Sequence, residues 1–138
     1  MIAYVDSSVV LRFVLDQPDR LEEARHFSRR LTSLLTQIEC LRGVDAMRHR
    51  DCLSDEEFLA KRAEVFTQLR RMQRVVPTLS VFQRAGDPFP VSLRTLDAIH
   101  LATALRLREG HAPDLVFATH DRRLGAAARV FDFEVVGC

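Results

Sequence analysis

The sequence contains few cysteines, no long apolar run and almost no net charge. Its three cysteines are an odd number without C-x-x-C spacing, which argues against both a disulfide framework and a zinc site. No run of 18 apolar residues predicts a membrane span. Residues 1–5 lack the basic start and long apolar segment of a secretory signal. We therefore expect a cytoplasmic protein.

Charge of one sign is also missing, because 20 Lys and Arg face 19 Asp and Glu, for a net charge of +1. This balance does not indicate nucleic acid in the way that a strongly basic domain would. Lys61 is the only lysine, and the other basic residues are arginines, which suit bidentate phosphate contacts. A coding bias toward arginine explains this equally well, so arginine use supports nucleic-acid binding only weakly.

Several motifs of common enzyme classes are absent. The chain has no G-x-x-x-x-G-K or G-x-G-x-x-G loop, so backbone cradling of nucleotide phosphates has no support. It has no nucleophile elbow. Asp6-Ser7-Ser8 lacks a second Asp two residues on, which disfavours a phosphoaspartyl phosphatase.

The 138 residues, 47% of them hydrophobic, suffice for one core, and we expect a single domain over 1–138. Apolar runs predict buried strands at 2–5, 115–119 and 133–136, with short extended pieces at 31–32 and 75–79. Helical patterns cover residues 7–15, 21–31, 33–44, the stretch after a capping box at Ser54, 95–110 and 122–130, and 86–90 is a loop. Alternating strands and helices predict an α/β fold with a largely parallel sheet and helices on both faces.

The positions of four acidic residues in these predicted strands and helices suggest one site. Asp6 and Asp121 come directly after predicted strands, and parallel strands end at the same edge of a sheet. Asp97 lies in the first turn of an apolar helix, and Glu39 leans toward the buried side of its helix. Three of the four also have a simpler explanation: Asp6 as a cap, Asp97 as a partner of the helix dipole, and Glu39 in an ion pair with Arg42, which we favour.

Convergence of these acids would need a counter-charge. Two carboxylates about 4 Å apart repel by roughly 4 kcal/mol at an effective dielectric of 20. Oxygen ligands suit Mg²⁺ or Mn²⁺, which would lower the pKa of a bound water and stabilise both oxygens of a phosphodiester displacement. We therefore expect nuclease chemistry. His100 and His120 stand near these acids, although packing at the edge of the core explains either histidine more readily.

The residues that carry these acids resemble the PIN-domain family of nucleases, and within it the VapC-type toxins of toxin–antitoxin pairs. The resemblance rests on residues 4–8, 33–42, 93–102 and 117–124, the third being the most specific. It implies a PIN-like three-layer α/β/α sandwich with a mainly parallel central sheet. It also implies a metal-dependent endoribonuclease with catalytic, metal-binding acids at Asp6, Glu39, Asp97 and Asp121, and an orienting role for Thr119.

By the same resemblance, a VapB-type antitoxin would block the site from a groove lined by the helices that follow Ser33 and Ser54, and the protein would form a homodimer. Met47 and Phe58 are candidates for the groove, with core packing as the better explanation. Two departures stand out: residues 130–132 replace a customary Gly before the last strand, where Asp132 tolerates a left-handed conformation, and no fifth acid follows Asp121.

Some points stay open at this level. One or two metals are possible, and the RNA substrate, with transfer, ribosomal and messenger RNA as candidates, is not specified. The alternatives to a toxin are a non-catalytic RNA- or protein-binding module with the same fold and a housekeeping nuclease.

Overall fold

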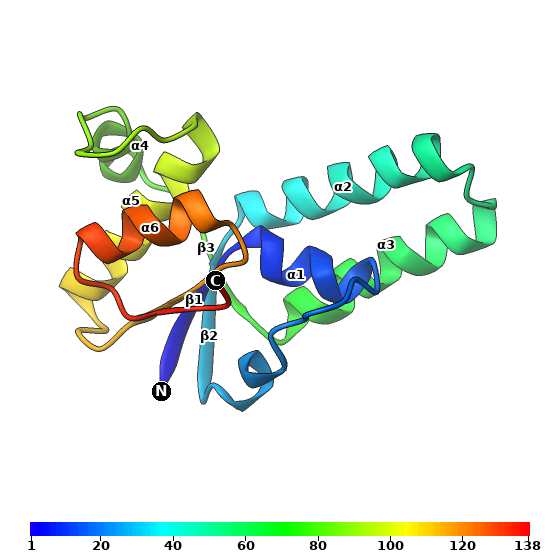
Figure 1. Cartoon of the computed structure of the whole chain (residues 1–138), viewed down its shortest axis with the longest axis horizontal. Coiled ribbons are helices and arrows are strands. Elements are labelled where there is room, and N and C mark those ends of the chain that lie inside the picture. The colour runs from blue at the N-terminus through cyan, green and yellow to red at the C-terminus, as the bar shows by residue number, and fades with distance from the viewer.

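The fold is built on one parallel sheet of five strands. In the computed structural model, which describes residues 1–138, the strand order is β3-β2-β1-β4-β5, and all four pairings are parallel (Figure 1). The strands are β1 (Ile2–Val5), β2 (Arg29–Ser33), β3 (Gln73–Val75), β4 (Val116–Ala118) and β5 (Val135–Val136). The predicted parallel sheet is confirmed.

Helices cover both faces of the sheet and complete the predicted three-layer sandwich. They are α1 (Ser7–Val14), α2 (Leu35–Asp51), α3 (Asp55–Arg70), α4 (Leu79–Ala85), α5 (Thr95–Gly110) and α6 (Arg122–Val130), together with a 3₁₀ helix, η1 (Glu22–His26). Helices α1, α2 and α3 share one core cluster with Ala3 and Val5, and helices α5 and α6 share the other with Tyr4. Successive residues of β1 therefore face opposite layers, as the pleat requires.

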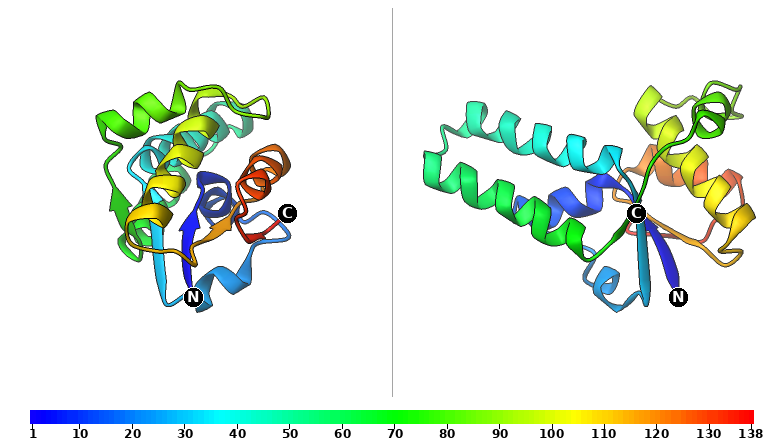
Figure 2. Two further views of the ribbon diagram at one scale, coloured as in Figure 1. Left: turned by 90° about the vertical axis from the view of Figure 1, so that its left-hand side faces the viewer. Right: turned by 180° about the vertical axis from the view of Figure 1, so that it is seen from behind.

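Helices α2 and α3 form an antiparallel hairpin that extends beyond the sheet (Figures 1 and 2). The predicted capping box starts α3: Ser54 accepts from the backbone of Glu57, whose side chain accepts from the backbone of Ser54. None of the helices combines the length and apolarity needed to cross a membrane.

The last turn before β5 behaves as the sequence predicted. Asp132 has φ of 61°, in the left-handed region where glycine is the usual residue. Asp is one of the few other residues that visit this region at modest cost. The missing glycine therefore leaves the fold intact.

Two local predictions were wrong. The helix expected over 21–31 is the short η1 followed by β2, because residues 29–33 pair with β1 on one side and β3 on the other. Residues beyond Pro77, expected to remain extended to residue 79, instead begin α4, with the Thr78 hydroxyl accepting from the backbone of Val81. In the first case long-range strand pairing outweighs a local helical pattern, and in the second a cap was overlooked.

Candidate active site

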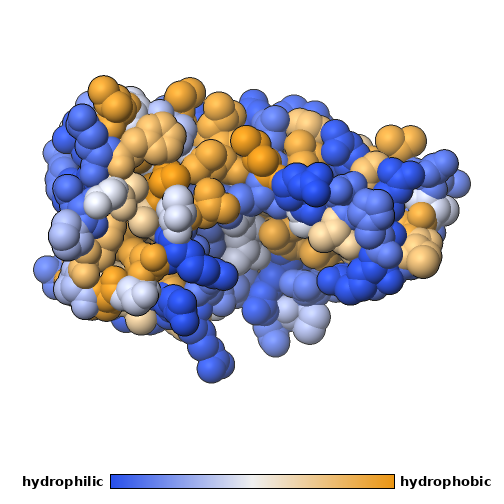
Figure 3. All heavy atoms as spheres, turned by 90° about the horizontal axis from the view of Figure 1, so that it is seen from above, coloured by the Kyte–Doolittle hydropathy of each residue, from blue (hydrophilic) through white to orange (hydrophobic).

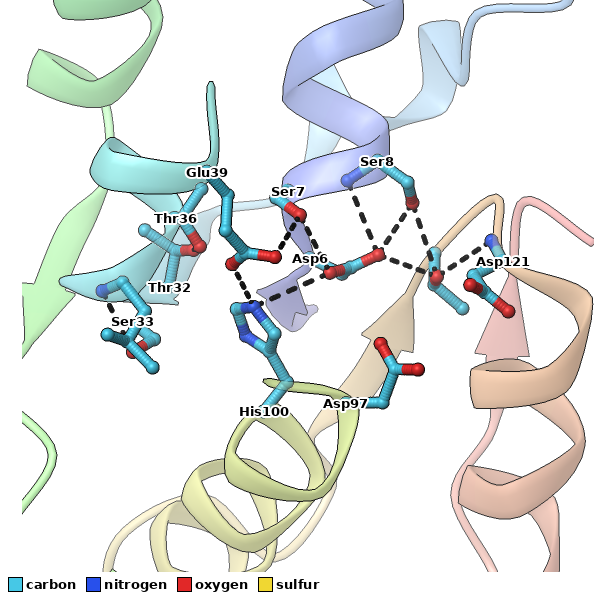
Figure 4. Close-up of polar contacts among 12 residues, drawn as sticks. Asp6, Ser7, Ser8, Thr32, Ser33, Thr36, Glu39, Asp97, His100 and Asp121 are labelled. Atoms are coloured by element: carbon cyan, nitrogen blue, oxygen red, sulfur yellow. Dashed lines mark hydrogen bonds and ion pairs between the residues drawn. The ribbon is translucent and has the colours of Figure 1, made fainter. Parts of the chain in front are cut away.

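The four predicted acids lie at the edge of the sheet where the strands end (Figure 4). Asp6 directly follows β1, and Asp121 begins α6 three residues after β4. Glu39 comes from the second turn of α2, the helix that follows β2, and Asp97 is the third residue of α5. Because the sheet is parallel, elements far apart in the sequence deliver their carboxylates to one place.

Asp6 is the most firmly held of the four. It is buried and extends the sheet through a backbone hydrogen bond to Ala118. Its carboxylate accepts from the backbone of Ser8 at 3.3 Å, from the Ser8 hydroxyl at 2.6 Å and from the Thr119 hydroxyl at 2.9 Å. Asp6 is thus both the N-cap of α1 and a member of the acidic group. The simple explanation and the functional one are compatible.

Glu39 is held by donors from two other elements. Its Oε2 accepts from the Ser7 hydroxyl at 3.1 Å, and its Oε1 lies 2.5 Å from His100 Nε2. The predicted ion pair between Glu39 and Arg42 is wrong, because Arg42 pairs with Asp45 at 2.9 Å on the outer face of α2. Glu39 points instead toward α1 and α5.

His100 lies inside this group and has no exposed surface. Its Nδ1 lies 2.7 Å from the Tyr4 hydroxyl, and its Nε2 lies 3.7 Å from Asp6 Oδ1. Burial alone would lower the pKa of His100, but the hydrogen bond to Glu39 and the nearby carboxylate of Asp6 outweigh it and raise this pKa above its ordinary value. A substrate cannot reach the ring.

Asp97 and Asp121 share one cation, Arg94. The guanidinium donates from Nε to Asp97 Oδ2 and from Nη2 to Asp121 Oδ2, each at 2.9 Å. The Arg94 side chain is 66% exposed, whereas those of Asp97 and Asp121 are 12% and 26% exposed. Burial raises the pKa of Asp97, and the nearby carboxylates raise it further against the opposing effect of Arg94. Asp121 also caps α6 by accepting from the backbone of Arg123 and Leu124.

Thr119 joins the two pairs of acids. Its hydroxyl donates to Asp6 and accepts from the backbone N–H of Asp121 at 3.0 Å. His120, in contrast, turns toward the end of the chain, where Nδ1 lies 2.8 Å from the Gly137 carbonyl. Burial lowers the pKa of His120.

Comparison with known proteins identifies the family of the chain. The family described as PIN domain matches residues 3–130. The chain belongs to the PIN-domain family. It is 32% identical over 138 residues to ribonuclease VapC46 of Mycobacterium tuberculosis, covering 96% of this chain and 95% of that protein. It is also 34% identical over 108 residues to ribonuclease VapC35 of the same species, covering 78% and 72%.

Solved structures share the fold of this PIN domain at low sequence identity. One is the crystal structure of VapBC2 from Rickettsia felis bound to a promoter DNA fragment, with a TM-score of 0.65, 14% identity, and coverage of 98% of this chain and 97% of that one. This likeness supports the α/β sandwich and the placement of its strands.

The donors of this PIN domain suit a hard divalent cation, because all four acids offer only oxygen. In the present side-chain arrangement no three His, Cys, Asp or Glu side chains are grouped closely enough to hold a metal ion. Arg94 lies between two of the acids. Binding of a cation by all four acids therefore requires Arg94 to move.

Sequence reasoning missed two groups of this site, Arg94 and Tyr4. Arg94 precedes Asp97 by three residues, a spacing that brings side chains together at the start of a helix. Tyr4 is the only tyrosine and lies in a buried strand, where its hydroxyl requires a partner. Both signals were present, but neither identifies the partner by itself.

Proposed function

We propose that this protein is a metal-dependent endoribonuclease and the toxin of a type II toxin–antitoxin pair. The observation that carries the proposal is the group of four carboxylates at the carboxyl edge of the sheet, linked through Ser7, Thr119, His100 and Arg94. Relatives named ribonuclease VapC46 and VapC35 support the reaction class. As part of the proposal, residues 1–138 form one PIN domain.

Asp6, Glu39, Asp97 and Asp121 are the proposed ligands of Mg²⁺ or Mn²⁺. When bound, such a cation lowers the pKa of a coordinated water and stabilises the negative charge that develops on the phosphodiester. The burial of Asp6 and the two donors on Glu39 support this assignment, because they fix carboxylate oxygens that a cation could share.

The chain's own residues have distinct tasks in this proposal. Ser8 and Thr119 orient Asp6, while Ser7 and His100 orient Glu39. Arg94 offsets part of the negative charge of Asp97 and Asp121. Its release would leave an exposed guanidinium beside the site, where it suits an RNA phosphate.

The partners in this proposal are RNA, a VapB-type antitoxin and a second copy of the chain. The structures of VapBC2 from Rickettsia felis and of VapBC-1 from nontypeable Haemophilus influenzae, the latter at a TM-score of 0.61 and 16% identity, support the antitoxin. Exposed apolar side chains also gather over α4 on the face where the strands end (Figure 3). Val76, Leu79 and Phe82 are 64%, 73% and 47% exposed. These exposed apolar side chains support the contact with a second copy of the chain. Light scattering of the purified chain, with and without the antitoxin, tests both the homodimer and the complex with the antitoxin.

The reaction is tested by incubating purified, antitoxin-free protein with total RNA in EDTA, in Mg²⁺ and in Mn²⁺, alongside Asp6→Asn. We expect discrete products that require the metal and are missing with the variant. Mapping the cut ends then decides whether transfer RNA or another RNA is the substrate. Absence of cleavage by folded wild-type protein would contradict the proposal and favour a non-catalytic binding module.

A further inference from the structure

A buried chain of three polar side chains runs from the core to the candidate site. It links Tyr4 of β1, His100 of α5 and Glu39 of α2, through contacts of 2.7 Å and 2.5 Å on the two ring nitrogens of His100. Tyr4 and His100 have no exposed surface, whereas the Glu39 side chain is 20% exposed. Only the last member of the chain reaches solvent.

The direction of these hydrogen bonds follows from the groups themselves. An ionised carboxylate only accepts, so His100 Nε2 must carry the hydrogen that points to Glu39. In a neutral ring Nδ1 then has no hydrogen and accepts from the Tyr4 hydroxyl. In a charged ring Nε2 still donates to Glu39. The donor facing Glu39 is thus the same in both states, and Tyr4 selects that tautomer when the ring is neutral.

The two oxygens of Glu39 are held from different sides. His100 of α5 donates to Oε1 and the Ser7 hydroxyl of α1 donates to Oε2. The plane of the Glu39 carboxylate is therefore fixed by two helices other than α2, which carries Glu39. Each oxygen keeps a further lone pair. The same ring lies 3.7 Å from Asp6 Oδ1, so it faces two of the four acids.

A purely structural role does not require this histidine. The position is fully buried on α5, where an apolar side chain would avoid the cost of burying an imidazole. His100 is one turn beyond Asp97, so a single helix supplies one acid directly and the support for another.

From this geometry we propose that Tyr4 and His100 are positioning residues for Glu39 that set the affinity of the site for a divalent cation without touching the substrate. The inference rests on the proposed function. Loss of hydrogen-bond partners behind a metal ligand typically costs about 10- to 100-fold in metal affinity. The affinity for a divalent cation should therefore fall when a hydrogen bond of the buried chain is removed.

The test measures the dissociation constant for Mn²⁺ by electron paramagnetic resonance, without RNA, for wild type, Tyr4→Phe and His100→Phe. Tyr4→Phe removes one hydroxyl and should weaken binding several-fold, and His100→Phe should weaken it about 10- to 100-fold. The control is Thr67→Val, which removes a hydroxyl that donates to Ala63 of its own helix, near the end of α3 that leads into β3 and away from the acids. It should leave Mn²⁺ binding unchanged.

A double-variant cycle separates positioning from general damage to the core. In a Glu39→Gln background, Tyr4→Phe should cause no further loss of Mn²⁺ affinity if it acts through Glu39. An equal loss in both backgrounds, or no loss in the wild-type background, would overturn the inference even if RNA is still cleaved. Failure of wild type to bind Mn²⁺ would instead contradict the proposed function, and the inference would fall with it.

Discussion

The two halves of the acidic group are held by different physical means. Asp6 and Glu39 form one half, called the buried half after its largely buried partners, which are hydroxyls and an imidazole from α1, α5 and the segment after β4. Asp97 and Asp121 form the other half, called the open half because their shared partner Arg94 is mostly exposed, although the Asp97 side chain itself is only 12% exposed. Residues of one chemical type therefore sit in one site under different constraints.

This difference indicates which half is fixed by the fold and which can adjust. Buried hydrogen bonds to a charged group resist change, because each donor left unpaired pays its full desolvation cost. Exposed ion pairs contribute about 0–1 kcal/mol and rearrange readily. We expect the buried half to provide a preset frame and the open half to exchange Arg94 for another cation.

The largest expected contrast concerns stability. Asp6→Ala removes a helix cap and leaves the Ser8 and Thr119 hydroxyls without their acceptor, which should lower the free energy of unfolding by about 2 kcal/mol or more. Asp97→Ala removes only the ion pair with the exposed Arg94, so it should lower the free energy of unfolding by less than about 1 kcal/mol. Urea unfolding in EDTA at pH 7 measures both. Equal losses would show that the two halves do not differ.

Loss of Thr119, which links the two halves, should change stability less but should clearly weaken Mn²⁺ binding. Thr119→Val removes the hydroxyl that serves Asp6 and the backbone of Asp121, so we expect roughly 10-fold weaker Mn²⁺ binding with about 1 kcal/mol of lost stability. Thr67→Val is the control, since that hydroxyl donates to Ala63 of its own helix, α3, away from the acids. If the two variants bind Mn²⁺ alike, Thr119 does not couple the halves.

Removal of the Arg94 charge tests the open half directly. Arg94→Gln should tighten Mn²⁺ binding about two- to fivefold, because up to about 1 kcal/mol of competing ion pairing disappears. Arg84→Gln is matched to it, since Arg84 also pairs with a carboxylate, Glu109, but far along α5 from the acids. Weaker Mn²⁺ binding by Arg94→Gln would mean that Arg94 supports the cation rather than competes with it.

The sequence predicted well those features that depend on local pattern or on the logic of a parallel sheet. The bounds of α6, the capping box at Ser54 and the left-handed Asp132 follow from nearby residues. The position of Asp6 and Asp121 at one edge follows from where parallel strands end. These are the parts of the fold and the site that one sequence can specify.

The choice of partners could not be predicted in the same way. For Glu39 the local candidate was Arg42, three residues away, but the actual partner His100 is 61 residues away. Strand β2 likewise depends on β1 and β3, which no window around residue 30 contains. Local ion pairs and local helix propensity are weak, so burial against distant residues decides which partner or which secondary structure forms.

The smallest expected effect is the pH dependence of the open half. Because the pKa of Asp97 is raised in the folded chain, the folded state holds this proton more tightly than the unfolded state does. Ionisation of Asp97 therefore costs stability, and this cost grows as pH rises from the unfolded value of about 3.9 through the folded pKa. Asp97→Asn cannot ionise and still offers Arg94 an acceptor. In EDTA its thermal midpoint should exceed that of wild type by about 1–3 °C at pH 7, with the gap closing toward pH 4. A lower midpoint at pH 7 would show that the charge of Arg94 outweighs burial, so that the open half is held more firmly than its exposure indicates.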